Sequence, residues 1–320
     1  MATISRTKIR TRTTRSRQGK INLIDEKIVP FLWFNNNAEE AVNFYNSTFK
    51  NSKILRITHY GDSGPGPKGS VMSIIFKLEG QTFYALNGGP EFTFTPSTSF
   101  YVSCKTTNEI NALWRNLSQG GKVLMELAKY PFAEKYGWVQ DRYGISWQLI
   151  ISTNIQKITP FLMFAGEQQG KAEQAINFYV SLFKNSKIIN LNRYSESDIG
   201  QTGSVIHSEF KLNGQIFMAM DSAINQDYSF SQAISYFVNC KTQREVDEFW
   251  EKLSEGGQKQ QCGWLIDKFG VAWQIVPTIL DELLNDPDQV KSTRVMNAMM
   301  QMGKIDIKAL KSAYNNHHIS

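Results

Sequence analysis

A carboxylate and an imidazole stand two residues apart in the segment SVIHSEF, at Glu209 and His207. If this segment is a strand, both side chains point to the same face, because side chains alternate along a strand. Such a pair facing a cavity can act as general acid and general base. Both are candidate catalytic residues, but a strand face in contact with solvent is the simpler interpretation of the pattern.

A glutamine occurs twice in the same sequence context. The stretch DRYGISWQLI returns later as DKFGVAWQIV, so that Trp147-Gln148 and Trp273-Gln274 occupy matching positions. A glutamine can hydrogen-bond a ligand, and a tryptophan can line a pocket for a flat or apolar molecule. The alternative is that the amides are paired within the protein, as buried amides must be, and that the indoles only pack.

Two further candidates break the repeat. Cys262 stands where the first copy has Tyr136, and a reactive thiol there would need a neighbouring cation or helix N-terminus, which the sequence does not reveal. Asn87 is followed by two glycines, whose backbone can approach a ligand closely. A small buried residue and a simple turn are the respective alternatives.

The three cysteines, Cys104, Cys240 and Cys262, have no CxxC or Cys/His spacing. This excludes a disulfide framework and the common zinc motifs. A reducing compartment, the cytoplasm, is therefore the predicted location.

These residues lie in a chain that repeats itself. KIVPFLWF matches KITPFLMF, AVNFYNSTFKNSKI matches AINFYVSLFKNSKI, and SFYVSCKT matches SYFVNCKT, always in the same order. The period, between 126 and 136 residues, is far too long for a solenoid and indicates duplication of a whole domain.

Each copy contains two βαβββ units, according to its hydrophobic periodicity. In the first copy, strands are predicted over 28–34, 53–59, 69–78 and 81–87 around a helix over 38–49, then over 98–104, 122–126, 136–140 and 145–151 around a helix over 107–118. The predicted fold class is α+β, with four such units in two tandem domains. After Pro277 the pattern becomes helical.

The predicted organisation is a disordered basic tail over 1–24, domains over 25–153 and 154–278, and a helical extension over 279–320. Residues 1–20 carry seven Lys and Arg and no acid, whereas the whole chain has a net charge of +6. The rest is therefore close to neutral and lacks the basic surface of a nucleic-acid-binding domain.

No apolar run approaches the roughly 18 residues of a membrane span, and the polar N-terminus does not resemble a signal peptide. The tail's composition also suits a transit peptide or a solvated arm.

Paired βαβββ units, FY in the first helix and a D-x-x-G turn before the last strand resemble the vicinal oxygen chelate superfamily, which includes glyoxalase I, extradiol dioxygenases and bleomycin resistance proteins. PFLWF, AEEAVNFY and CGWLIDKFGVAWQIVP are similar to its PhnB-like branch, which often carries the label 3-demethylubiquinone-9 3-methyltransferase-like. The resemblance covers about residues 27–315. It implies that two units enclose a cavity and that related single domains dimerise, so the fused copies are expected to form a pseudo-dimer within a monomer or a homodimer.

Metal-binding members of the superfamily take His or Gln from the first strand of a unit and Glu from the last. The resemblance places the Glu positions on Gln148 and Gln274, with Ala85 and Ala219 in the other units, and the His positions on Ser99 and Ser235. Neutral amides and hydroxyls hold a divalent ion weakly. We therefore expect no metal and no cofactor, and assign these Gln and Ser residues to ligand binding.

The function expected from the sequence is metal-independent binding of a small, partly apolar molecule. The alternatives are an enzyme of the superfamily (a lyase, isomerase or dioxygenase) or an interaction module whose tail contacts an acidic partner. The methyltransferase label receives no support from the residues, because a Rossmann-type enzyme needs a Gly-rich strand-to-helix loop. The Gly-rich segment GDSGPGPKG leads into a strand instead.

Overall fold

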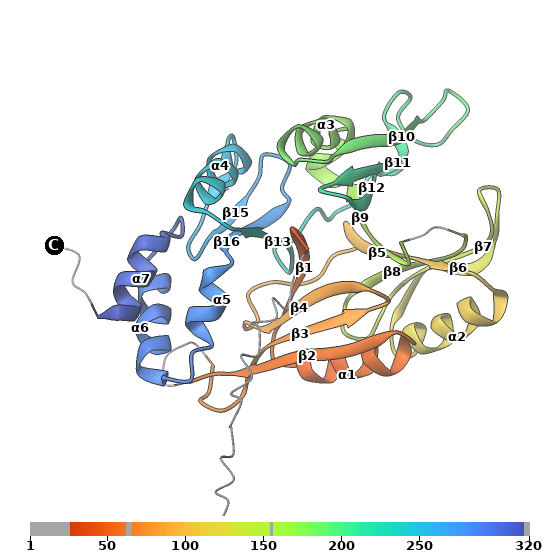
Figure 1. The fold of residues 1–320 in the computed structure, drawn as a ribbon. Helices are drawn as coiled ribbons and strands as arrows, with labels where there is room; N and C mark the ends of the chain where they lie inside the picture. The colour runs from red at the N-terminus through yellow and green to blue at the C-terminus, as the bar shows by residue number, and fades with distance from the viewer. Residues whose placement is uncertain (1–25, 62–65, 154–155, 317–320) are drawn as a thin grey trace, which may run out of the picture.

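The computed structural model describes residues 26–61, 66–153 and 156–316. The predicted basic tail over 1–24 lies outside the described residues. Four βαβββ units follow one another along the chain (Figure 1). Unit 1 comprises β1 (Ile28–Phe34), α1 (Ala38–Thr48), β2 (Ser52–His59), β3 (Val71–Leu78) and β4 (Gln81–Asn87). Unit 2 comprises β5 (Thr98–Cys104), α2 (Thr107–Ser118), β6 (Lys122–Tyr130), β7 (Ala133–Gln140) and β8 (Ser146–Ile151).

The second copy repeats this order and ends in helices. Unit 3 comprises β9 (Ile158–Phe164), the 3-10 turn η1 (Gly166–Gln168), α3 (Ala172–Leu182), β10 (Lys187–Arg193), β11 (Val205–Leu212) and β12 (Gln215–Asp221). Unit 4 comprises β13 (Ile234–Cys240), α4 (Gln243–Ser254), β14 (Gln258–Lys259), β15 (Trp264–Ile266) and β16 (Ala272–Pro277). Then come α5 (Ile279–Leu284), α6 (Gln289–Met300) and α7 (Ile307–Asn315). The predicted fold class, with four βαβββ units and C-terminal helices, is confirmed.

The strands form two eight-stranded sheets, and each sheet takes one unit from each copy. Sheet A has the order β14-β15-β16-β13-β1-β4-β3-β2 and joins units 4 and 1. Sheet B has the order β10-β11-β12-β9-β5-β8-β7-β6 and joins units 3 and 2. The joints are antiparallel pairs of first strands, β1 with β13 and β5 with β9. The two sequence copies therefore do not correspond to the two sheets.

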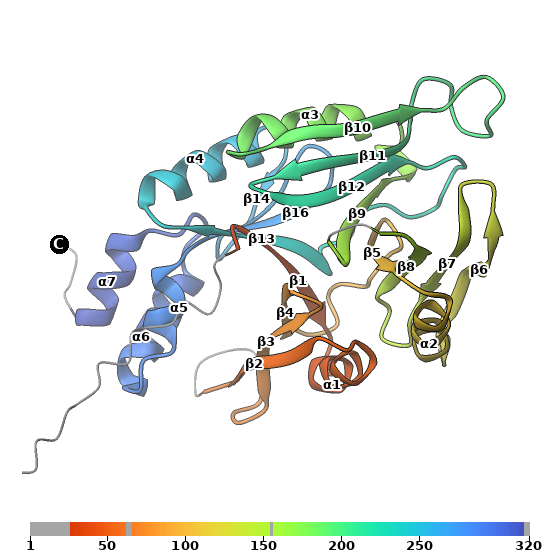
Figure 2. The ribbon, with the colours of Figure 1, turned by 45° about the vertical axis from the view of Figure 1, so that its right-hand side comes forward.

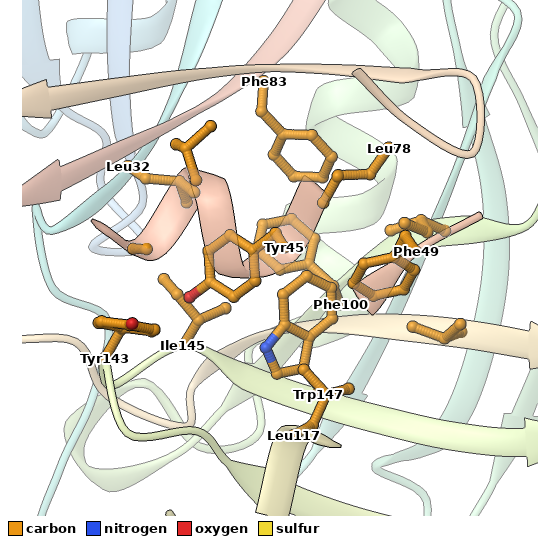
Figure 3. Packing of buried hydrophobic residues seen from close by; sticks show 14 of the residues in the cluster. Leu32, Tyr45, Phe49, Leu78, Phe83, Phe100, Leu117, Tyr143, Ile145 and Trp147 are labelled. Carbon is orange, nitrogen blue, oxygen red and sulfur yellow. The ribbon is translucent and has the colours of Figure 1, made fainter. Parts of the chain in front are cut away.

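Helices α1 to α4 each pack on one face of their own unit (Figure 2). On this helix side the cores do follow the copies: one cluster consists mainly of residues from units 1 and 2, and another mainly of residues from units 3 and 4. Figure 3 shows Tyr45, Phe100 and Trp147 packed together in the first of these cores. The opposite face of each sheet, which we call its inner face, has a smaller apolar cluster of its own.

A buried carboxylate in the D-x-x-G turn ties each copy together. Asp267 accepts hydrogen bonds from the backbone N–H groups of Phe269 and Val271 at 2.8 and 3.0 Å. It also accepts from the Tyr179 hydroxyl at 2.6 Å and from the Trp273 indole Nε1 at 2.8 Å. Burial raises the pKa of Asp267 to about 6, while these four donors act in the opposite direction.

The first copy repeats this arrangement. Asp141 accepts from the hydroxyl of Tyr45 at 2.8 Å and from the indole of Trp147 at 2.7 Å. The turn, the Tyr of the helix motif NFY and the Trp of the Trp-Gln pair are thus joined through one carboxylate. This contact explains why the three motifs recur together.

The C-terminal helices lie beside sheet A, on the side of the molecule away from the β6–β7 hairpin (Figures 1 and 2). Unit 4 has a shortened hairpin, with two residues in β14 and three in β15. The backbone N–H groups of Cys262 and Gly263 donate instead to Met302 and Gly303, between α6 and α7, at 2.7 and 2.8 Å. The loop between α6 and α7 therefore supplies backbone hydrogen-bond acceptors to the part of unit 4 where its hairpin is short.

We predict that Asp267→Ala lowers the free energy of unfolding by about 3–5 kcal/mol, because it leaves the buried donors of Tyr179 and Trp273 without a partner. Urea unfolding followed by tryptophan fluorescence measures the change. Asp227→Ala, at an exposed aspartate, is the control and should leave the unfolding midpoint almost unchanged. Equal losses in the two variants would show that the buried carboxylate does not anchor the fold.

Candidate functional site

The amide of Gln148 lies on the inner face of sheet B and is paired within the protein. Its Nε2 donates to the Ser99 hydroxyl at 2.8 Å, and its Oε1 accepts from the Tyr136 hydroxyl at 2.8 Å. Gln148 is 4% exposed, and burial raises the pKa of the Tyr136 phenol. The Gln148 amide is thus buried in the inner face and fully paired within the protein.

Gln274 occupies the corresponding place on sheet A, where its Nε2 donates to the Ser235 hydroxyl at 3.0 Å. The residue that replaces Tyr136 is Cys262, and its backbone has a φ of 57°. Its sulfur turns toward α6, within 3.7 Å of the Met299 carbonyl oxygen. Burial raises the pKa of this thiol, which is the opposite of what a nucleophilic cysteine needs.

The tryptophans and Asn87 face elsewhere. Trp147 and Trp273 are each 1% exposed and belong to the helix-side cores, with their indoles bonded to the buried aspartates. The ligand-lining role predicted for them is wrong for the inner face, because they alternate with the glutamines along the strand. The Asn87 side chain accepts from the Ala38 N–H at 2.8 Å and donates to the Val71 carbonyl at 2.9 Å, so it holds the start of α1.

Glu209 reaches the same inner face as Gln148. Strand register places four residues side by side across four strands of sheet B: Glu209 on β11, Met218 on β12, Phe161 on β9 and Ser99 on β5. At about 4.8 Å between neighbouring strands, this row spans at most about 14 Å. A carboxylate from the third unit therefore shares one face with the Ser99–Gln148 pair of the second.

Three rings line this row. Tyr101 stacks on Phe161 with centroids 6.1 Å apart, and Phe161 lies 6.2 Å from His207. Burial raises the pKa of Tyr101 to about 12, with the Glu209 carboxylate as the second cause. Burial also lowers the pKa of His207, against the pull of Glu209, so the imidazole is neutral at pH 7. The predicted pair is thus half-buried on a ring-lined face and does not lie on a solvated strand.

Methionines complete the surroundings. Met163 and Met218 are 3% and 2% exposed, and Met220, Trp138 and Tyr228 pack against the same cluster. The sequence pattern alone points to neither the methionines nor Tyr228. Because side chains alternate along β9 and β12, the sequence places Met163, Met218 and Met220 on the inner face once it is known which residues of these strands face inward.

The inner face of sheet A has the same row with different chemistry. Its register runs Ile75, Tyr84, Phe31 and Ser235, so an isoleucine stands where sheet B has Glu209. Ser73 replaces His207 in the repeat.

Helix α5 approaches this face of sheet A. Arg56, the β2 partner of Ile75, forms an ion pair with Asp281 of α5. Phe237 belongs both to the inner-face cluster and to the core of the C-terminal helices. By contrast, none of the described residues of the sheet B cluster belongs to the core of the C-terminal helices.

The residues do not fit the metal site that the resemblance implies. The glutamines already have partners, and Ala85 and Ala219 lie in the helix-side cores instead of on the inner faces. Within the part of the chain that the structure describes, no three His, Cys, Asp or Glu side chains gather as metal ligands would. The inner faces thus present amides and hydroxyls at the positions where metal-binding relatives have carboxylate and imidazole.

A polar cleft lies where units 1 and 3 meet, lined by Gln81, Gln156 and Gln215 among others. Gln215 donates to Gln81 at 2.8 Å, and Gln156 donates to the Ile216 carbonyl at 2.9 Å. Lys157 in this cleft is paired too, with Glu109 at 2.7 Å. These groups are satisfied by one another, so the inner face of sheet B remains the better candidate site.

The comparisons with known proteins agree with this fold. The sequence model of the family described as 3-demethylubiquinone-9 3-methyltransferase matches residues 26–150 and again 156–276. A PhnB protein from Bacillus cereus is 46% identical over 40% of this chain and 100% of its own, with a TM-score of 0.38. Glyoxalase I from Zea mays, 12% identical, covers 81% of this chain and 95% of its own with a TM-score of 0.54, a likeness of fold alone. The comparison with curated proteins finds no match.

Within the described residues, no helix is long and apolar enough to cross a membrane.

We predict that the folded protein reacts only slowly with a thiol reagent such as DTNB at pH 7. Burial raises the pKa of Cys104 and of Cys240 to about 12 and raises that of Cys262, so little thiolate is present. In denaturant all three thiols should react at once. A rapid reaction of one equivalent that Cys262→Ser abolishes would restore Cys262 as a catalytic candidate.

Proposed function

We propose that this chain, which belongs to the family described as 3-demethylubiquinone-9 3-methyltransferase, binds a small molecule on the inner face of sheet B without a metal. The observation that carries the proposal is the row from Glu209 to Ser99, which brings polar groups of two different units onto one ring-lined face. Small-molecule sites are lined mainly by apolar and aromatic side chains with a small number of polar groups, and the row has this composition.

The difference between the two sheets supports one site per chain. Sheet A lacks the carboxylate and the imidazole, and α5 approaches its inner face through the ion pair of Arg56 and Asp281. Sheet B keeps both groups. The binding site therefore belongs to units 2 and 3, and units 1 and 4 carry the C-terminal helices.

A catalytic role for the same face is the second candidate. His207 is neutral at pH 7 and lies near the Glu209 carboxylate, and either group can take a proton from a bound molecule. Methyl transfer is not part of the proposal. Both sheets are mixed sheets of βαβββ units, in contrast to the doubly wound parallel sheet with a Gly-rich loop of Rossmann-type enzymes.

A thermal-shift screen of small metabolites tests the site. Ligand at about 100 times its Kd should stabilise the protein by about 2.7 kcal/mol. We predict that Met220→Trp, which fills the inner face of sheet B, abolishes the shifts. The matched control is Leu86→Trp, at the equivalent half-buried position of sheet A, and it should keep them. Loss of the shifts in the control alone, or no hits with the wild type, would overturn the proposal.

Metal independence has its own test. We predict that the shifts produced by the hits are unchanged after dialysis against EDTA and are not increased by added Zn²⁺, Ni²⁺ or Mn²⁺. The reason is that Glu209 and His207 are not joined by a third His, Cys, Asp or Glu ligand among the described residues. A shift that needs one of these ions would show that the site holds a metal after all.

A further inference from the structure

The apolar centre of the inner face of sheet B is covered. Phe161 and Met163 are each 3% exposed, and Met218 beside them is 2% exposed. A ligand of the proposed site therefore needs part of this cover to move. We propose that residues 223–228, between β12 and β13, form a lid over this face and that Tyr228 is the side chain that closes it. The inference rests on the proposed function, and it adds how the site is reached.

The lid contacts the inner face through one ring. Tyr228 packs against the buried cluster of this face, which consists of Phe161, Met163, Ala165 and Met218. The backbone at Tyr228 also passes close to the end of β9, because a Cβ added to Gly166 would lie 3.0 Å from the Tyr228 carbonyl oxygen. Elsewhere in the lid, Ile224 is 57% exposed, and Asn225 and Asp227 are exposed as well. Release of the Tyr228 ring would thus free the lid from the face.

The backbone of the lid is fixed at both ends and weakly held between them. At one end, the Ser222 N–H donates to the Phe164 carbonyl at 2.9 Å. At the other end, the Thr95 hydroxyl donates to the Ser229 carbonyl at 2.7 Å. Between these anchors, no backbone N–H of residues 223–228 donates a hydrogen bond to another residue that the structure describes. Segments with exposed backbone and few buried contacts open locally at a low free energy.

The matching segment of the first copy is held more tightly. There Gly89 donates its N–H to the Asn35 carbonyl at 3.1 Å, and its carbonyl accepts from the Trp33 indole at 2.9 Å. Gly89 has a φ of 108°, in the region that favours glycine. In the second copy Ala223 takes the place of this glycine, and Met163 takes the place of the indole donor. The lid therefore lacks both hydrogen bonds for reasons that lie in its own sequence.

The lid is also longer than its counterpart. The offset between matching residues of the two copies is 134 at Asn87 and 136 at Ser99, so the second copy has two additional residues in this segment. The ring at its end is kept, since Phe92 of the first copy lies edge-on against Trp33 with centroids 5.0 Å apart. Because a longer connection has more conformational freedom, the Tyr228 ring can leave the face while both anchors stay in place.

A buried reporter thiol tests the lid. Met163→Cys places a thiol in the cluster against which Tyr228 packs, and its reaction with DTNB is followed with the parent protein as the blank for the native cysteines. We predict a slow reaction that Tyr228→Ala accelerates at least about tenfold, because the rate follows the population of the open form. Phe92→Ala, at the matching position of the first copy, is the control and should leave the rate unchanged.

Urea separates opening of the lid from unfolding of the whole protein. A short segment exposes little surface when it opens, so the reporter should react at nearly the same rate in water and in urea below the unfolding transition. A rate that rises steeply with urea, or a rate that Tyr228→Ala leaves unchanged, overturns the lid. Circular dichroism checks that each variant is folded, and Met218→Cys in the same cluster replaces the reporter if Met163→Cys is not.

The thiol assay needs no ligand, so its outcome is separate from that of the proposed function. If Tyr228→Ala opens the face to DTNB but the metabolite screen gives no hits, the lid stands and the binding site fails. If the hits depend on Met220 while the reporter is insensitive to Tyr228→Ala, the site stands and the lid fails.

Discussion

The buried aspartate of the D-x-x-G turn is the contact on which the rest of each copy depends. Asp141 and Asp267 each accept four hydrogen bonds from a turn, a helix and a strand that are distant in sequence. The four donors offset part of the cost of burying the charge, while burial still raises the pKa of both carboxyl groups. The contact fixes Trp147 and Trp273 on the helix side, and the next residue of each strand must then face inward. The position of both glutamines on the inner faces follows from the position of the tryptophans.

The exchange of units between the sheets gives the chain its candidate site. Glu209 lies in the second copy and the Ser99–Gln148 pair in the first, and they share a face only because β9 pairs with β5. The same exchange joins units 1 and 4 in sheet A, where the C-terminal helices pack. The two inner faces differ: sheet A has Ile75 and Ser73 at the positions of Glu209 and His207 and is approached by α5, whereas sheet B has the carboxylate and the imidazole.

Much of the fold could be predicted from local pattern. The strands over 28–34, 81–87 and 98–104 and the helix over 107–118 have the predicted bounds, because alternation and helical periodicity are strong there. The β6–β7 hairpin extends beyond the predicted strands, and its pairing has register shifts that obscure the alternation. The assignment of Ala85 and Ala219 to inner-face positions was wrong by one residue. In a strand, one residue changes the face.

The sequence by itself determined the duplication, the four βαβββ units, the helical C-terminus and the family resemblance, because these depend on patterns within short segments. It also indicated Gln148, Gln274, Glu209 and His207, whose chemistry is visible in their residue types. Only the tertiary structure decided which of them meet. It paired the glutamines with Ser99 and Ser235, turned Cys262 toward α6, and placed Glu209 in a row with Phe161 and Ser99. The physical reason is that strand pairing across the two copies is long-range. The local sequence pattern does not show which unit's first strand will pair with which.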